Sequence, residues 1–195
     1  MLLASLGFAQ TSDSNAARTQ QSSITIKVFK SGVFSGFAHD HVVAAPIARA
    51  EVDPQRLSGE ITVVVKEMKV MDKEVSDKDR AEIQNTMLGP KVLDAPQFPE
   101  IHFKSSRVEQ ASPQHYRVTG TLELHGAKRE LTLDVTGDGE HYHGATKLKQ
   151  SEFGIKPISL FGGSVKVKDE LELEFDVFAP PPAVKTEPGA KGESK

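Results

Sequence analysis

The feature that most constrains this fold is a strict alternation of apolar and acidic residues near the C-terminal end of the chain. From position 170 to 177, every odd residue is Leu, Phe or Val and every even residue is Glu or Asp. Successive side chains of a β-strand point to opposite faces, so this stretch predicts a strand with one dry and one wet face. The same period of two recurs over 24–28, 61–66 and 116–124. Strands that are dry on one side only are typical of antiparallel sheets.

The alternation, with turn signals between the runs, predicts an all-β fold. The expected strands cover residues 23–31, 42–52, 59–68, 101–109, 115–125, 128–138, 141–150 and 164–178. About eight antiparallel strands can close into a barrel whose interior holds side chains or one small ligand. Residues 76–88 break the pattern and predict a short helical insertion, which Ser76 can cap and Gly89-Pro90 ends.

The strand periodicity is confined to a single domain over residues 23–179. The flanking segments 10–22 and 180–195 are rich in polar residues, Pro and Gly, and we expect them to be disordered. Residues 1–9 predict a truncated signal peptide, because the apolar run ends in Gly7-Phe8-Ala9 with small residues at the cleavage positions. A frayed N-terminus is the alternative. With a signal peptide, the protein would be periplasmic or secreted.

Composition narrows the function further. Lys+Arg total 24 against Asp+Glu 27, a net charge of -3, which disfavours nucleic acid as a partner. The chain has Cys 0, so thiol nucleophiles, disulfides and Cys-ligated metals are excluded. The N-terminal apolar run is too short for a transmembrane segment. No phosphate-binding loop or serine-nucleophile motif occurs, so the sequence gives no positive sign of an enzyme.

The barrel interior is expected to be short of large side chains. Aromatic residues form 6% of the chain and Trp is absent, while the inward candidates include small branched residues such as Val28, Val63 and Val135. A long, thin apolar cavity is therefore predicted, and an apolar ligand in it would gain about 25 cal/mol for each Å² removed from water. A tightly packed core without a ligand is the alternative, because apolar stripes usually form cores.

Three motifs, in their order and spacing, resemble the YceI-like family over residues 23 to 178. They are LDAPQFPEIHF at 93–103, preceded by Asp79-Arg80, then GTLELHG at 120–126 and SEFGI at 151–155. The resemblance implies a lipocalin-like antiparallel barrel with a helical insertion, usually exported to the periplasm, that holds a long polyisoprenoid or similar lipid. The segment GVFSGFAHDH at 32–41 looks like a subgroup of the family with a paired-histidine signature.

We therefore expect a binding or carrier protein, a monomer or homodimer without a cofactor, rather than an enzyme. Its partner would be an apolar small molecule: a polyisoprenoid, a quinone or a fatty-acid-like lipid. The expected lumen residues are Val28, Phe34, Phe37, Val63, Val65, Phe103, Leu122, Leu124, Val135, Phe153, Ile155, Phe161 and Phe175. A polar rim at the end of the barrel is expected from His39, His41, Arg80 and His125.

The histidines favour a second hypothesis, a metal-dependent barrel enzyme. His39 and His41 would share one face of an extended strand, and His141 and His143 repeat that spacing. Imidazoles without thiolates suit zinc, copper or nickel, although the glutamate that would complete a cupin-like motif is missing at short range. The preferred interpretation is that His39 and His41 lie at the barrel rim without metal, with at least one bonded to an acid or a backbone carbonyl.

The signal-peptide interpretation predicts where the mature protein begins. If the chain is exported, cleavage after Ala9 should leave Gln10 as the first residue. N-terminal sequencing of the exported protein tests this, and a mature chain that still begins at Met1 would contradict it.

Overall fold

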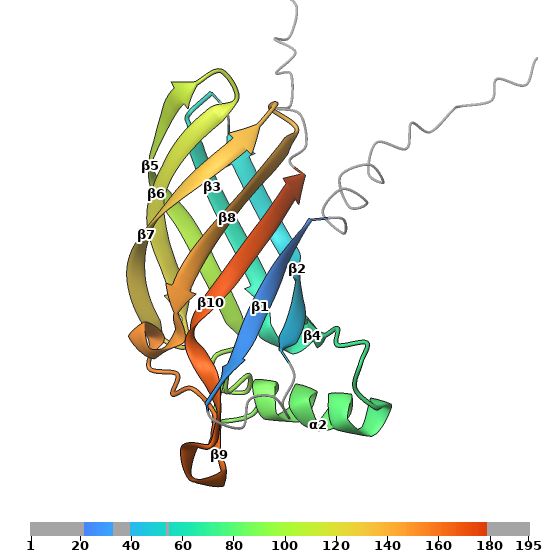
Figure 1. Cartoon of the computed structure of the whole chain (residues 1–195). Helices are drawn as coiled ribbons and strands as arrows, with labels where there is room; N and C mark the ends of the chain where they lie inside the picture. The colour runs from blue at the N-terminus through green and yellow to red at the C-terminus, as the bar shows by residue number, and fades with distance from the viewer. Residues whose placement is uncertain (1–21, 33–39, 54, 179–195) are drawn as a thin grey trace, which may run out of the picture.

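The computed structural model describes residues 22–32, 40–53 and 55–178, which form one closed antiparallel sheet (Figure 1). The barrel strands are β1 (Ser23–Ser31), β2 (His41–Asp53), β3 (Ser58–Val64), β5 (Glu100–Ser112), β6 (His115–Leu124), β7 (Ala127–Gly137), β8 (His141–Lys149) and β10 (Val165–Phe178). They are hydrogen-bonded in the order β1-β10-β8-β7-β6-β5-β3-β2, and β1 pairs with β2 to close the ring. The two-residue strands β4 (Lys69–Val70) and β9 (Ser159–Leu160) extend it beside β2 and β10. The predicted all-β antiparallel barrel is confirmed.

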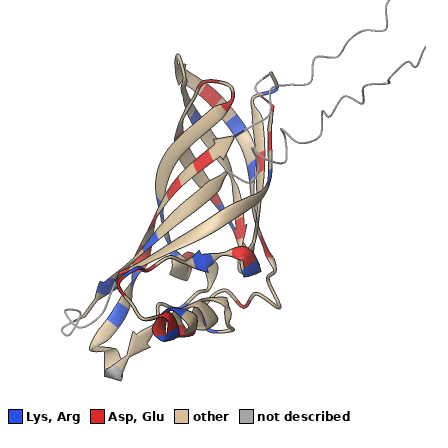
Figure 2. Cartoon of the chain, turned by 90° about the vertical axis from the view of Figure 1, so that its right-hand side faces the viewer, with Lys and Arg blue, Asp and Glu red and all other residues tan. Residues whose placement is uncertain are grey.

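Strand β10 shows how the period of two builds the wall. Its Leu and Phe side chains at 171, 173 and 175 face the lumen, while its acids face outward. On the outer face, Lys147 Nζ lies 2.9 Å from Glu172 and 3.1 Å from Glu170. Hydrogen bonds to Glu172 and Glu170 raise the pKa of Lys147 above its ordinary value. Figure 2 shows Lys, Arg, Asp and Glu in bands along the strands.

The predicted helix is confirmed as α2 (Asp77–Leu88), which lies across one end of the barrel (Figure 1). Ser76 is its N-cap and accepts a hydrogen bond from Asp79 N at 3.1 Å, and Gly89 is its C-cap. None of its residues is fully buried. Gln84 instead fastens it to the barrel, because its Oε1 accepts from Val70 N and its Nε2 donates to Met68 O, each at 2.8 Å.

Two predicted boundaries are wrong. The strand expected over 59–68 ends at Val64, and a 3-10 turn, η2 (Val65–Glu67), follows. Its partner β5 begins only at Glu100, so Val65 N donates to Pro99 O and the chain turns away. Ser22, expected to be disordered within 10–22, is fully buried, and its carbonyl accepts from Ile47 N at 3.1 Å. The expected signal peptide at 1–9, the rest of 10–22 and the tail at 180–195 lie outside the described residues.

Glycines let three aromatic rings lie close against the barrel wall. The rings of Phe103, Tyr142 and Phe175 lie over Gly120, Gly137 and Gly144 respectively. Tyr142 pairs directly with Gly137 and Phe175 with Gly144 across neighbouring strands. A Cβ at Gly144 would come within 2.4 Å of Phe175 Cζ and 2.7 Å of Asp134 O, closer than real Cβ contacts. Each ring therefore occupies the space that a side chain on the neighbouring strand would fill.

The glycine at 144 is predicted to be required for this packing. Gly144→Ala should lower the free energy of unfolding by about 1–3 kcal/mol, because either the Phe175 ring or the Asp134 backbone must move. Urea denaturation measures the change. Ala145→Val adds bulk on the exposed face of the same strand and should change stability by less than about 0.5 kcal/mol. Equal stability of Gly144→Ala and the unmodified protein would contradict the packing argument.

Candidate ligand-binding site

The lumen of the barrel contains two adjoining apolar cavities. The larger, of about 630 Å³, lies between the barrel and α2. The smaller, of about 170 Å³, lies further from the helix. Both are lined by Ile24, Leu122, Leu148 and Leu173, so these four side chains mark the level at which the cavities meet. Together the two cavities follow the barrel from α2 toward the opposite end.

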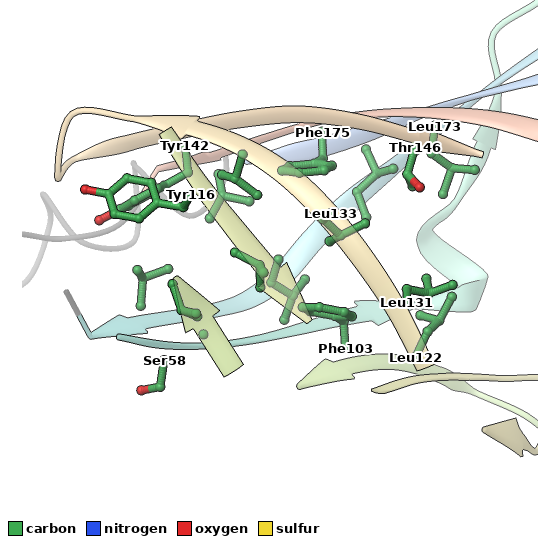
Figure 3. A pocket seen from close by; sticks show the side chains of 18 of the residues that line it. Ser58, Phe103, Tyr116, Leu122, Leu131, Leu133, Tyr142, Thr146, Leu173 and Phe175 are labelled. Atoms are coloured by element: carbon green, nitrogen blue, oxygen red, sulfur yellow. The ribbon is translucent and has the colours of Figure 1, made fainter. Parts of the chain in front are cut away.

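The smaller cavity ends at a pair of tyrosines (Figure 3). The rings of Tyr116 and Tyr142 have centroids 6.4 Å apart, and their hydroxyl groups point away from Leu133 and Phe175. Burial raises the pKa of the Tyr142 hydroxyl above its ordinary value. The tyrosines therefore present their rings to the lumen and their polar atoms to the end of the barrel.

The larger cavity is apolar along its walls and polar only near α2. Its helix side is formed by Ile83 and Met87, and its barrel side is mostly Val, Leu and Ile. Polar lining comes from His41 and Gln150, from Thr86, and from the charged residues Lys30, Lys166, Asp79 and Glu82. The lumen thus has an apolar interior and one polar end.

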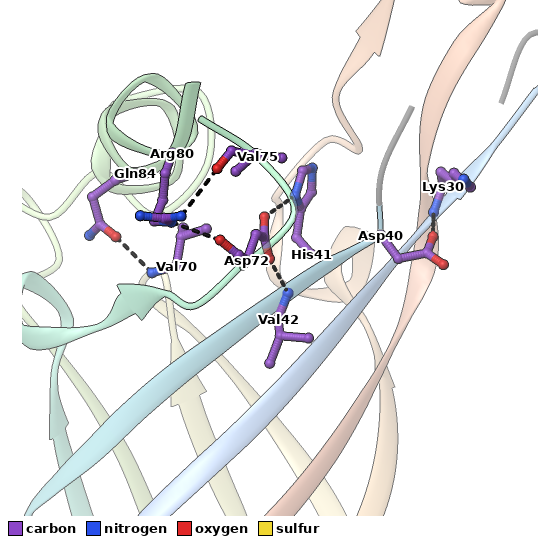
Figure 4. Close-up of polar contacts among 9 residues, drawn as sticks. All are labelled: Lys30, Asp40, His41, Val42, Val70, Asp72, Val75, Arg80 and Gln84. Atoms are coloured by element: carbon purple, nitrogen blue, oxygen red, sulfur yellow. Dashed lines mark hydrogen bonds and ion pairs between the residues drawn. The ribbon is translucent and has the colours of Figure 1, made fainter. Parts of the chain in front are cut away.

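A hydrogen-bond network fixes His41 at this polar end (Figure 4). Its Nδ1 lies 2.6 Å from Asp72 Oδ2, and Asp72 Oδ1 accepts from Val42 N at 2.8 Å. The Asp72 side chain is only 5% exposed. Arg80 Nε donates to Asp72 O at 2.7 Å, and its guanidinium also reaches Val75 O. The loop before α2, the helix and β2 are therefore joined through Asp72.

Eight of the expected lumen residues line the two cavities. They are Val28, Val63, Phe103, Leu122, Leu124, Val135, Ile155 and Phe175. Val65 and Phe153 line neither cavity and are buried in the hydrophobic core. Val65 leaves the lumen because it belongs to the turn η2, and Phe153 lies in η3 (Gln150–Phe153), beside the part of β7 that does not pair with β8. Phe34, Phe37 and the Phe161 side chain lie outside the described residues.

The expected polar rim is only partly assembled. His41 lines the larger cavity and bonds an acid, as predicted. Arg80 braces the loop before α2 rather than lining a cavity. His125 sits in the β6–β7 turn, where its ring centroid lies 4.4 Å from that of Phe98 at a tilt of 53° and its Nδ1 lies 3.2 Å from Phe153 O. The position of His39 falls outside the described residues.

The three described histidines of the metal hypothesis, His41, His141 and His143, do not converge. His41 pairs with Val28 of β1, whereas His141 pairs with Phe178, beside the start of β1. Val28 lies five positions beyond Ser23 along the strand, a distance of roughly 17 Å. His141 and His143 instead contact Asp176 on β10, at 2.9 and 3.3 Å. Within the described ranges, no three His, Asp or Glu side chains are grouped to hold a metal ion.

Three functional candidates were missed by sequence reasoning: Gln150, Asp72 and the tyrosine pair. Gln150 is 6% exposed and lines the larger cavity, yet it directly follows a strand of alternating residues and carries no distinctive signal. Asp72 lies 31 residues from His41, so their contact is set by the fold. The tyrosines could have been placed, because residues 116 and 142 fall on the apolar phase of their predicted strands.

The fold and its lumen define a closed β-barrel with an internal apolar cavity, and comparison with known proteins gives its family. The YceI-like domain matches residues 15–179. This chain therefore belongs to the YceI-like family. A UPF0312 protein of Pseudomonas savastanoi pv. phaseolicola is 30% identical over 95 residues, or 44% of this chain and 43% of that protein. A UPF0312 protein of Vibrio parahaemolyticus is 28% identical over 115 residues, or 54% of this chain and 59% of that protein. The chain thus spans about half the length of these relatives.

Solved structures agree on the fold. BcnA of Burkholderia cenocepacia has a TM-score of 0.61 at 21% identity, covering 82% of this chain and 97% of that one. The Campylobacter jejuni YceI protein has a TM-score of 0.52 at 18% identity, covering 70% of this chain and 80% of that one. Among the residues that the structure describes, no helix is long and apolar enough to cross a membrane.

The bracing role of Arg80 can be measured. Arg80→Ala should lower the free energy of unfolding by about 2 kcal/mol, because the part-buried carbonyls of Asp72 and Val75 lose a charged donor. Amide hydrogen exchange in the loop 71–76 should also accelerate. Lys78→Ala removes an exposed cation from the same helix and should leave both measurements unchanged. Unaltered exchange in the Arg80 variant would show that the loop is held by other contacts.

Proposed function

We propose that this protein binds a long apolar ligand in the barrel lumen and acts as a binding or carrier protein. The observation that carries the proposal is the cavity of about 630 Å³ with predominantly apolar walls. Folded interiors have few voids larger than a water molecule. Ligand pockets are typically about 300–1,000 Å³, mostly apolar, with a few polar groups. This cavity disfavours the alternative raised by the sequence, a tightly packed core without a ligand.

The shape and energetics favour a chain-like ligand. The two cavities share Leu122 and Leu173 in their walls and follow one another along the barrel, which suits an extended tail. Each buried CH₂ group contributes about 0.8 kcal/mol, so a tail of about ten such groups would gain about 8 kcal/mol before the costs of association. A polyisoprenoid, a quinone or a fatty-acid-like lipid would satisfy these requirements. We propose these classes without a further cofactor.

A metal-dependent enzyme is the second candidate, since His41 lines the cavity. The binding function is favoured because Asp72 holds the Nδ1 atom of His41, and no further metal ligand is grouped with it among the described residues. Native mass spectrometry separates the two functions, since a carrier would retain a lipid mass and a metalloenzyme a metal adduct. The expected signal peptide at 1–9 supports a further proposal, that the carrier acts in the periplasm or after secretion.

A charge placed in the lumen should abolish ligand retention. Leu124 is 8% exposed and lines the larger cavity. Leu124→Lys should remove the co-purifying apolar ligand, because burying an unpaired ammonium costs several kcal/mol. Lipid extraction with mass spectrometry gives the readout, and circular dichroism reports whether the barrel is folded.

The control is Thr121→Lys, which places the same charge on the exposed face of β6 and should retain the ligand. Leu173→Trp tests the same point without a charge, because it fills the junction of the two cavities and should shorten the retained chain. Undiminished retention of the same lipid in folded Leu124→Lys and Leu173→Trp variants would rule out the lumen as the binding site.

A further inference from the structure

One nitrogen of the His41 imidazole is bonded by Asp72, and the other has no partner among the described residues. Asp72 can only accept a hydrogen bond when ionised, so the Nδ1 atom of His41, 2.6 Å away, carries the proton. The second Asp72 oxygen accepts from Val42 N, which fixes the carboxylate. His41 lines the larger cavity, and no described residue bonds its Nε2 atom. In the neutral imidazole this Nε2 is a hydrogen-bond acceptor.

Gln150 is held in an equivalent way on the other side of β1 and β10. Its Nε2 donates to the carbonyl of Lys168 at 2.8 Å, and a carbonyl can only accept, so the orientation of the amide is determined. The side chain is 6% exposed and lines the same cavity. No described residue donates to its Oε1. The half-buried His41 and the buried Gln150 therefore both offer acceptors in this cavity.

The charged side chains at the same end of the cavity do not favour a ligand head of either charge. Lys30 and Lys166 line the cavity together with Asp79 and Glu82, so the formal charges cancel. Lys166, Asp79 and Glu82 are exposed to solvent, where charges interact weakly. The acceptors of His41 and Gln150 are then the groups that distinguish one neutral head from another.

We infer that the ligand carries an uncharged head that donates a hydrogen bond, such as an alcohol or a phenol, and that this head lies at the α2 end with its tail directed toward Tyr116 and Tyr142. The inference rests on the proposed lumen binding. It selects a prenyl alcohol or a hydroquinone-like head over a quinone, whose carbonyls only accept. Leaving buried acceptors unpaired is the cost that a ligand without a donor would incur.

Two probes that differ only in the donor test this. Geranylgeraniol and its methyl ether have the same tail, but only the alcohol has an O–H. Delipidated protein in mildly alkaline buffer, where free imidazoles are neutral, is titrated with each probe by displacement of anilinonaphthalene sulfonate. The alcohol should bind about three- to tenfold more tightly than the ether.

The decisive variant is Asp72→Asn. The new amide can keep its oxygen toward Val42 N and turn its NH₂ toward His41 Nδ1, which moves the imidazole proton to Nε2. That nitrogen becomes a donor that an ether oxygen also satisfies, so the preference for the alcohol should fall toward one. Gln150→Met removes the second acceptor and should lower the preference independently. Asp134→Asn makes the same chemical change on the exposed outer face and should leave the preference as it is in the unmodified protein.

The outcomes distinguish a failure of this inference from a failure of the proposed lipid-binding function. Equal binding of alcohol and ether by the unmodified protein, or a preference that persists in both Asp72→Asn and Gln150→Met, overturns the donor-head inference and leaves lipid binding intact. Failure of the unmodified protein to bind either probe counts against the proposed function itself, and the inference falls with it. A preference that is lost in the two lumen variants and kept in Asp134→Asn supports both.

Discussion

The lumen exists because β1 pairs along both of its edges, and the other features of the structure depend on that closure. Its residues 23–28 bond β2 on one side and β10 on the other. Without this strand, β2 and β10 would be open edges, and the apolar face would line a groove open to water. Ser22 secures the start of β1, since its carbonyl and hydroxyl accept from Ile47 N and Phe178 N. The β1–β2 pairing ends at Val28 and His41, so His41 stands where this seam opens at the α2 end.

Most of the barrel was predictable from local pattern, because the period of two is a property of each strand by itself. Neighbouring residues in the sequence are enough to indicate the apolar face of β10, the Ser76 cap and the His125-Gly126 turn. The end of β3 was not predictable, because Val63 and Val65 look alike in sequence. What distinguishes them is the partner strand, which has begun opposite Val63 and has not begun opposite Val65.

The motifs that carry the family resemblance supply residues that line the lumen and also a contact outside it. Phe98, His125 and Phe153 come from three separate motifs and meet at one place: the first two rings are in tilted contact, and His125 Nδ1 bonds Phe153 O. A Cβ on Gly126 would come within 2.7 Å of the Phe98 ring, so that glycine belongs to the same contact. Sequence reasoning placed His125 at a polar rim and Phe153 in the lumen, because contacts between residues so far apart leave no periodic trace. The same limit hid Asp72 and Gln150, whose partners are set only once the barrel has closed.

The helix covers the lumen without filling it, and this follows from how it is attached. An amphipathic helix that packed by an apolar stripe would drive large side chains into the barrel. Here no residue of α2 is fully buried, and Gln84 and Arg80 bond backbone groups of the barrel and of the loop before the helix. These hydrogen bonds hold α2 in place, whereas Ile83 and Met87 only border the cavity. Because these bonds use backbone atoms of 68–75, the helix is held at the end of the barrel without side chains that fill the cavity, whose polar lining includes His41 and Gln150.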